Sequence, residues 1–299
     1  MNTAWMKGII VPIVTPIKDD ESVDETSLRE HIDFLIDQGI DGILAFGSNS
    51  EFYMQTEEEM RTNLAIIINQ VRERIPVYMG IGAIRTSTCI ALARMGLDMG
   101  CRAIAVLQPM FVKLTNDELY THFSSIAAAI GDKPMLLYNN PGRTGYDIPS
   151  EVVAKLAHSS PNVVGMKDSS GNMTNTLEFI RRNRDVGFRV FVGKDTLIYS
   201  GLTVGCCGAV CSTANFLPTL VCSIWKKFEE GDLAGSLEAQ FKLNPIRIQM
   251  DKSSFPVATK DYLNLLGGHG TKPYLPSLPS DGQQMAGLRQ KLVEGGYLK

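Results

Sequence analysis

Short apolar runs alternate with longer segments of helical periodicity along most of the chain. The apolar runs predict eight strands, at Gly8–Val14, Gly42–Phe46, Val77–Ile81, Ala103–Leu107, Pro134–Tyr138, Val163–Lys167, Arg189–Val192 and Gly208–Cys211. The segments that follow them predict eight helices, at Thr26–Gln38, Thr56–Arg74, Thr86–Met99, Asn116–Ile130, Ser150–Ala157, Thr174–Arg184, Thr196–Leu202 and Phe216–Glu229. Thr56 and Asn116, each followed by acidic residues, are the expected N-caps of two of these helices.

The strict alternation of strands and helices indicates an α/β fold with a parallel sheet. Eight such units fit a closed (β/α)8 TIM barrel over residues 1–230. Residues 231–299 are expected to form a C-terminal helical extension packed on the barrel, with helices near Leu233–Met250, Val257–Leu266 and Gln283–Glu294. A doubly wound open sheet is the competing fold. It would usually offer a glycine-rich phosphate loop after its first strand, where this chain has Val11-Pro12-Ile13-Val14-Thr15-Pro16.

The composition is ordinary for a globular protein, with 44% hydrophobic residues, 20% charged residues and a formal net charge of -3. Nothing in it suggests a polyanion-binding surface, so we expect no nucleic-acid partner. No apolar run approaches the roughly 20 residues of a membrane span. The first seven residues have neither signal-peptide nor transit-peptide character. We therefore expect a cytoplasmic protein with no membrane partner.

The six cysteines show no CxxC pair, and no histidine lies at zinc-ligand spacing from them. They are Cys89, Cys101, Cys206, Cys207, Cys211 and Cys222. We interpret all six as small buried apolar residues in a reducing compartment, and we expect no metal site.

Lys167 interrupts the sixth predicted strand, which otherwise has the pattern of a strand buried on both faces. Lysine is almost never fully buried without a partner or a function, because its ammonium group loses hydration there. The same desolvation favours a neutral amine, which forms a Schiff base with a carbonyl compound. The alternative is a lysine that reaches solvent or pairs with Asp168. Lys194 also follows a strand, but it comes after a glycine in a loop, so Lys167 is the preferred nucleophile.

In a (β/α)8 barrel, the carboxyl ends of the strands and the loops after them share one pocket. Tyr138 ends the fifth predicted strand, where a phenol beside a Schiff-base lysine can relay protons. Arg143 follows and presents a fork suited to a carboxylate. After the second strand, Gly47-Ser48-Asn49-Ser50-Glu51 offers backbone N–H groups and polar side chains that can hold a carboxylate. Taken separately, these features also fit a core tyrosine, a surface arginine and a polar turn.

Together, these motifs resemble those of the dihydrodipicolinate synthase/N-acetylneuraminate lyase family. The matching segments are Gly47-Ser48-Asn49-Ser50-Glu51, Tyr138-Asn139 with Arg143-Thr144-Gly145, and Val164-Gly165-Met166-Lys167-Asp168. The resemblance extends over nearly the whole chain, from Gly8-Ile9-Ile10-Val11-Pro12 to the final helices. It implies a (β/α)8 barrel with a C-terminal helical extension, usually assembled as a homotetramer built from two dimers, and no required metal or organic cofactor.

The resemblance also implies the roles of individual residues. Lys167 matches the lysine that forms a Schiff base with pyruvate or another 2-keto acid, which then reacts with an aldehyde. Tyr138 matches the proton donor and acceptor. Ser48 and Asn49 match residues at the substrate carboxylate and the proton relay, and the backbone near Val210 matches a segment that faces the bound keto acid.

The sequence departs from the synthases at several positions, which leaves the subfamily open. Arg143 resembles the arginine that binds the carboxylate of the aldehyde substrate in dihydrodipicolinate synthases. Those synthases usually have two threonines where this chain has Ser48 and Asn49, and a glycine where it has Ser50. They usually also have a tyrosine, contributed across the dimer interface, where this chain has Phe111. Phenylalanine cannot pass a proton, so the usual Thr–Tyr–Tyr relay cannot form here.

Two alternatives therefore stand beside the synthase interpretation. Gly47-Ser48-Asn49 with Glu51-Phe52, and Gly165-Met166-Lys167-Asp168-Ser169, also resemble the 4-hydroxy-2-oxoglutarate and 2-keto-3-deoxy-sugar-acid aldolases. Those enzymes cleave a 2-keto-4-hydroxy acid through the same imine. A non-catalytic paralogue that binds a keto acid is the remote alternative, and the presence of both Lys167 and Tyr138 argues against it.

Overall fold

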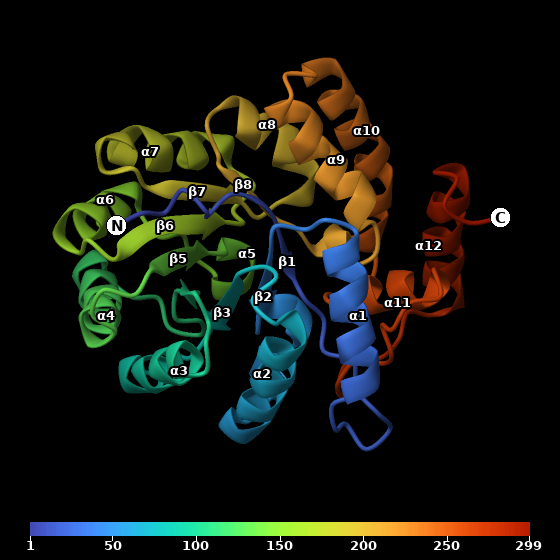
Figure 1. Cartoon of the computed structure of the whole chain (residues 1–299), viewed down its shortest axis with the longest axis horizontal. Coiled ribbons are helices and arrows are strands. Elements are labelled where there is room, and N and C mark those ends of the chain that lie inside the picture. The colour runs from blue at the N-terminus through green and yellow to red at the C-terminus, as the bar shows by residue number, and fades with distance from the viewer.

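The computed structural model describes residues 1–299 and shows a closed barrel of eight parallel strands surrounded by helices (Figure 1). The strands follow one another around the barrel in sequence order, and β8 pairs with β1 to close it. They are β1 (Gly8–Pro12), β2 (Gly42–Ala45), β3 (Val77–Ile81), β4 (Ala103–Leu107), β5 (Met135–Asn139), β6 (Val163–Asp168), β7 (Arg189–Val192) and β8 (Gly208–Val210). The predicted (β/α)8 barrel is confirmed, and the doubly wound alternative is wrong.

The helices on the outside of the barrel agree with the predicted segments to within a few residues. They are α1 (Glu25–Asp37), α2 (Glu57–Val71), α3 (Thr86–Asp98), α4 (Asn116–Ala129), α6 (Ser150–Ser159), α7 (Met173–Asn183), α8 (Ile198–Thr203) and α9 (Pro218–Glu229). A short helix in the loop after β5, α5 (Pro141–Thr144), was not expected from the sequence. The predicted N-cap Thr56 is confirmed, since its side chain accepts a hydrogen bond from the Glu59 N–H.

The predicted N-cap Asn116 is wrong, because Asn116 is the first residue inside α4. Thr115 caps this helix instead. Its side chain accepts a hydrogen bond from the Glu118 N–H, while the Glu118 carboxylate accepts one from the Thr115 N–H. This reciprocal pair satisfies two backbone donors at the helix end, which a cap at Asn116 would not do.

Two hydrophobic layers hold the barrel together. A cluster of 57 buried residues fills the space between the strands and the outer helices. A smaller cluster of 10 residues packs inside the barrel, with side chains such as Leu44, Tyr78 and Phe191 contributed by different strands. The interior is therefore packed with side chains, as in other (β/α)8 barrels, and a pocket forms only toward the ends of the strands.

A β-bulge in β6 sets the direction of the side chains at its carboxyl end. Met135 pairs with Val163, whereas the next residue of β5, Leu136, pairs with Gly165, so Val164 is an extra residue in β6. The register then continues without interruption and pairs Tyr138 with Lys167. Because paired residues of parallel strands share a face, the bulge places Lys167 on the same side of the sheet as Tyr138.

Three helices follow the barrel: α10 (Leu233–Met250), α11 (Val257–Leu265) and α12 (Gly282–Glu294). They lie together beside α9 and α1 at one side of the barrel (Figure 1). Ile246 of α10, Tyr262 of α11 and Leu288 of α12 join Val14 and Phe216, from the segments after β1 and β8, in one buried cluster. The helices are therefore packed against the barrel, and none of those in the structure is long and apolar enough to cross a membrane.

Candidate active site

The ends of the strands surround a cavity of about 330 Å³ at the carboxyl end of the barrel. Its walls come from the loops after most of the strands and from the segment between α10 and α11. Only 3 of its 17 lining residues are hydrophobic. The lining residues are Ser48, Asn49, Tyr138, Asn140, Gly142, Arg143, Lys167, Ser169, Ser170, Gly193, Lys194, Asp195, Val210, Ser212, Arg247, Asp251 and Phe255. All six residues predicted from the sequence to form the site are among them.

Lys167 and Tyr138 lie side by side in this cavity. The Lys167 side chain is 5% exposed, and its Nζ lies 4.2 Å from the centre of the Tyr138 ring. Asp168 does not neutralise it, because the Asp168 carboxylate accepts hydrogen bonds from Asn139, Ser170 and Thr176. Pairing with Asp168, one of the two alternatives considered for this lysine, is therefore wrong.

The Tyr138 hydroxyl has the surroundings of a proton relay. It lies 3.4 Å from the Ser48 hydroxyl, and the Asn140 carboxamide donates a hydrogen bond to it over 2.9 Å. Burial by itself raises the pKa of Tyr138, but the charge of Lys167 and the hydrogen bonds of Ser48 and Asn140 outweigh this, so the pKa is lowered. A lower pKa brings the phenol closer to neutral pH, so that more of it is present as the phenolate, the form that can act as a general base.

Lys194, the rival nucleophile, also lines the cavity, but it lies in the loop after β7 and is half-buried. Asp195 beside it is buried and accepts a hydrogen bond from the Thr213 N–H. The structure thus brings both lysines to the cavity, and only Lys167 lies against the phenol.

Ser48 and Asn49 lie in one short 3-10 turn, η1 (Ser48–Ser50), directly after β2. Both are buried, but their side chains have different environments. The Ser48 hydroxyl lies at the Tyr138 phenol. The Asn49 carboxamide donates to the Ser212 hydroxyl over 2.8 Å and accepts from the Thr259 hydroxyl over 3.0 Å. Ser48 is thus directed to the Tyr138 hydroxyl, whereas the Asn49 side chain bridges the loop after β8 and helix α11.

Arg143 and Val210 line the cavity from different elements. Val210 ends β8 and is buried at the cavity floor. Arg143 lies in α5, and its guanidinium stacks on the Phe255 ring at 4.5 Å from the ring centre. Phe255 and Arg247 of α10 also line the cavity, and neither was expected there from the sequence. Both come from the C-terminal extension, and no motif near them indicates a functional position.

Phe111 is absent from the cavity lining. It follows β4, has a backbone φ of 73° and is 95% exposed, so its ring points away from the site of its own chain.

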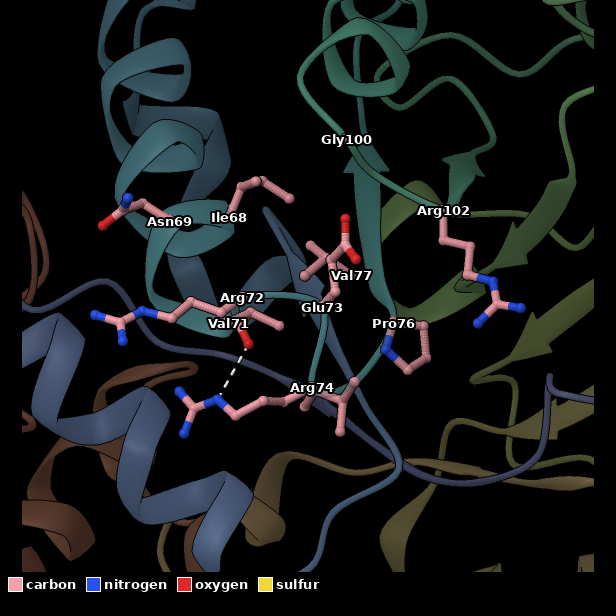
Figure 2. Close-up of a pocket in the computed structure, with 11 residues that line it drawn as sticks. Ile68, Asn69, Val71, Arg72, Glu73, Arg74, Pro76, Val77, Gly100 and Arg102 are labelled. Atoms are coloured by element: carbon pink, nitrogen blue, oxygen red, sulfur yellow. Dashed lines mark hydrogen bonds between the residues drawn. The ribbon is translucent and has the colours of Figure 1, made fainter.

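A larger hollow, of about 750 Å³, lies at the opposite end of the barrel, around the turn between α2 and β3. Figure 2 shows that the guanidinium groups of Arg72 and Arg102 lie on opposite sides of it, while Arg74 is bound to the Val71 carbonyl. No nucleophile lines this hollow, and its charged groups do not converge. The amino end of a (β/α)8 barrel is also not where active sites form.

No group of three or more His, Cys, Asp or Glu side chains that could hold a metal ion is present. All six cysteines are free. Five of them are buried, as predicted from the sequence, whereas Cys207, expected to be buried as well, is partly exposed.

A buried lysine beside a phenol at the carboxyl end of a (β/α)8 barrel is typical of class I aldolases, the lyases that work through a Schiff base. The chain belongs to the dihydrodipicolinate synthetase family, whose model matches residues 5–294. Members of this family are lyases of the class I aldolase type.

Curated relatives cover almost the full chain. A 4-hydroxy-tetrahydrodipicolinate synthase of Nitratidesulfovibrio vulgaris is 33% identical over 97% of this chain and 99% of its own length. The enzyme of the same name from Acidovorax is 33% identical over 99% of each chain.

Solved structures agree with the fold. The dihydrodipicolinate synthase of Thermotoga maritima has a TM-score of 0.94 and 26% identity over 98% of this chain and 99% of its own. The Escherichia coli K12 prophage protein YagE, a family member solved in complex with pyruvate, has a TM-score of 0.93 and 28% identity, over 97% of this chain and 99% of its own. The chloride-inhibited enzyme of Acinetobacter baumannii, also complexed with pyruvate, has a TM-score of 0.92 and 30% identity, over 98% of this chain and 99% of its own.

Proposed function

We propose that this protein makes or breaks a carbon–carbon bond through a Schiff base between Lys167 and pyruvate. The first candidate reaction is that of a 4-hydroxy-tetrahydrodipicolinate synthase, the condensation of pyruvate with aspartate semialdehyde. The observation that carries the proposal is the buried Lys167 Nζ, 4.2 Å from the centre of the Tyr138 ring, in a polar cavity.

The chemistry follows from the electronics of the imine. Once Lys167 has given up its proton, its amine attacks the C2 carbonyl of pyruvate, and loss of water gives an imine that becomes an electron sink when protonated. Tyr138 removes a proton from C3, which leaves an enamine. The enamine attacks the aldehyde carbon, the new alkoxide takes up the proton, and water releases the product from the lysine. In the cleavage direction the same steps run in reverse.

The charges around the cavity support an anionic substrate. Four cationic side chains, of Arg143, Lys167, Lys194 and Arg247, line the cavity with only two acidic ones. Both acidic groups are already bound, Asp195 to the Thr213 N–H and Asp251 to Arg247. We propose that Ser48, the turn that carries Asn49 and the backbone near Val210 hold the pyruvate carboxylate, and that Arg143 holds a distal carboxylate.

The 4-hydroxy-2-oxoglutarate and 2-keto-3-deoxy-sugar-acid aldolases and dehydratases are the second candidates. The Ser48-Asn49 pair and the absence of a tyrosine at Phe111 favour them, because both differ from the usual synthase pattern. Hydroxyl groups of Ser169 and Ser170 in the lining also suit a polyhydroxy chain. Both candidates use the same imine and differ in the second substrate.

Trapping with borohydride tests the shared step. In the presence of pyruvate, borohydride is expected to add a stable mass to Lys167, which peptide mass spectrometry locates. A label on Lys194, or no label, rejects the assignment. A pyruvate-release assay over a panel of 2-keto-4-hydroxy acids, run beside condensation of pyruvate with aspartate semialdehyde, then separates the candidates. Labelling without turnover of any substrate indicates a keto-acid-binding paralogue.

The Arg143→Ala variant tests how the second substrate is recognised. We expect the substitution to reduce kcat/KM for substrates with a distal carboxylate far more than for neutral sugar acids, because only the former lose a charged hydrogen bond. Equal losses for both kinds of substrate show that Arg143 does not read a distal charge.

We also propose that the protein assembles, as a homotetramer, through the face that carries Phe111. A phenylalanine at positive φ that is 95% exposed is costly for an isolated chain. Tyr53 and Ile84, in the loops after β2 and β3, expose apolar side chains at the same end of the barrel. The free cysteines agree with the proposed reducing, cytoplasmic location.

A further inference from the structure

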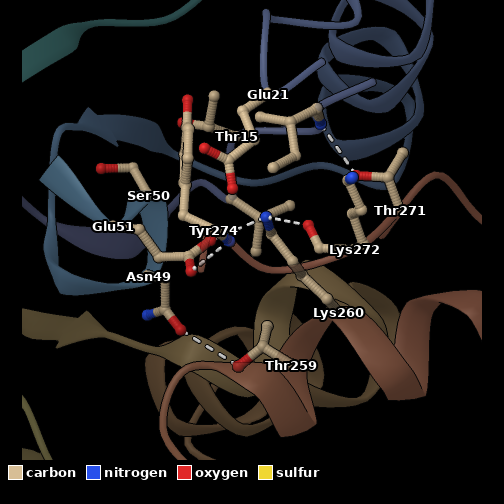
Figure 3. Close-up of polar contacts among 12 residues, drawn as sticks. Thr15, Glu21, Asn49, Ser50, Glu51, Thr259, Lys260, Thr271, Lys272 and Tyr274 are labelled. Atoms are coloured by element: carbon tan, nitrogen blue, oxygen red, sulfur yellow. Dashed lines mark hydrogen bonds and ion pairs between the residues drawn. The ribbon is translucent and has the colours of Figure 1, made fainter. Parts of the chain in front are cut away.

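A buried ion pair joins the turn of Ser48 and Asn49 to the C-terminal extension. Glu51 and Lys260 have side chains that are 1% and 0% exposed, and Glu51 Oε2 lies 2.7 Å from Lys260 Nζ (Figure 3). The other carboxylate oxygen accepts a hydrogen bond from the Tyr274 N–H, and Lys260 Nζ donates to the Lys272 carbonyl. One charged cluster thus connects the loop after β2, helix α11 and the segment that follows α11.

A second contact lies beside this pair. Thr259, the neighbour of Lys260 in α11, donates its hydroxyl hydrogen to the Asn49 carboxamide, as Figure 3 shows. Two consecutive residues of one helix therefore bind two residues of the turn that lines the cavity. Glu51 has a backbone φ of 55°, a left-handed conformation that is unfavourable for a side chain with a Cβ and needs such contacts to persist.

Stability alone is a weak reason for this arrangement. Two charges lose their hydration when they are buried, and a well-packed hydrophobic pair of similar volume is often as stable as the ion pair or more so. A buried ion pair is, however, directional, because each charge is satisfied in only one geometry. Neither Glu51 nor Lys260 lines the substrate cavity, so these charges do not act on the substrate directly.

We propose that Glu51, Thr259 and Lys260 are positioning residues, by which the C-terminal extension sets the geometry of Ser48 and Asn49 for the pyruvate carboxylate. The inference rests on the proposed function, since it assumes that this turn binds the keto acid. It assigns the C-terminal extension a role in the site: the extension holds the carboxylate-binding turn in place through two consecutive residues of α11.

The test measures the pyruvate concentration that gives half-maximal borohydride labelling of Lys167, and compares it between the unmodified protein and four variants. Thr259→Val removes the hydroxyl and keeps the shape of the side chain, and Thr259→Ser restores the hydroxyl. The double variant Glu51→Gln/Lys260→Met removes both charges together, so neither is left buried alone. Lys227→Met, which breaks a surface ion pair with Asp232, is the matched control.

We expect Thr259→Val and the double variant to raise the half-maximal pyruvate concentration by about tenfold to a hundredfold, because a misplacement of about 1 Å can cost up to about a hundredfold. Thr259→Ser and Lys227→Met should bind pyruvate like the unmodified protein, and thermal melting should show folded protein throughout. If the double variant fails to fold, the comparison of Thr259→Val with Thr259→Ser decides the question alone, because these two variants differ in a single hydroxyl.

If Thr259→Val is folded and its half-maximal pyruvate concentration is unchanged, the inference is overturned and the proposed function stays intact. A loss of affinity in Thr259→Ser equal to that in Thr259→Val also overturns it, since the hydroxyl would then be irrelevant. Absence of any label in the unmodified protein is a different result, which rejects the proposed function and the inference with it.

Discussion

Protonation of a buried histidine is expected to weaken this fold in mild acid. His31 of α1 is 1% exposed, and its Nε2 lies 3.2 Å from Asn215 Oδ1. The Asn215 orientation is set by its other contacts, because Oδ1 accepts from the Val14 N–H and Nδ2 donates to the Pro12 carbonyl. The His31 Nε2 must therefore carry hydrogen, so the neutral ring already satisfies this contact.

The size of the effect follows from the pKa. Burial lowers the pKa of His31 from 6.5 to about 4, and the hydrogen bond to Asn215 only partly opposes this. Well above pH 6.5 the imidazole is neutral in both states, and its contribution to stability is constant. Between pH 6.5 and 4 the unfolded chain takes up a proton that the folded chain does not, so stability falls as the pH falls. The loss is about 2 kcal/mol between pH 7 and pH 5, and about 3 kcal/mol once the pH is well below 4.

Two measurements check this prediction. Urea unfolding at fixed protein concentration, at pH 7 and pH 5, should show that His31→Gln loses about 2 kcal/mol less than the unmodified protein does. Because the chain has 4 histidines, histidine-selective NMR can follow each ring, and the signal missing in His31→Gln identifies His31. A His31 ring that titrates near pH 6.5, or equal pH dependence in both proteins, would falsify the reasoning.

Three further perturbations probe the site and the assembly. Tyr138→Phe should lower kcat by roughly 10²–10⁴-fold, because it removes the proton relay; a loss below tenfold in steady-state assays contradicts that role. Gly165→Ala places a Cβ against the Arg189 carbonyl oxygen, so we expect a loss of about 1–3 kcal/mol in unfolding free energy and a lower melting temperature. An unchanged melting curve would show that β6 can shift to make room. Phe111→Asp should dissociate the proposed oligomer, and an unaltered mass in sedimentation excludes this face as the interface.

The sequence alone was enough to predict the order and approximate bounds of the strands and helices of the barrel. Helical and strand periodicity are local properties, and short apolar runs separated by amphipathic helices leave few folds other than a parallel barrel. The candidate residues could be found for the same reason. Lys167 and Tyr138 end strands, and in a (β/α)8 barrel all strand ends meet at one pocket.

Contacts between distant residues could not be predicted in this way. The bulge at Val164, which directs Lys167 to the face of Tyr138, depends on how β5 and β6 pair and has no local signature. The choice of Thr115 over Asn116 as a cap depends on the exact entry of the chain into α4.

Only the tertiary structure decided what surrounds the predicted residues. Asn49 looked like a substrate ligand, but its carboxamide is bound to Thr259, 210 positions away in the sequence, and Glu51 is paired with Lys260. Phe255 and Arg247 reach the cavity from outside the barrel. The physical reason is that side-chain partners form when packing brings remote segments together, and no periodicity within either segment carries that information.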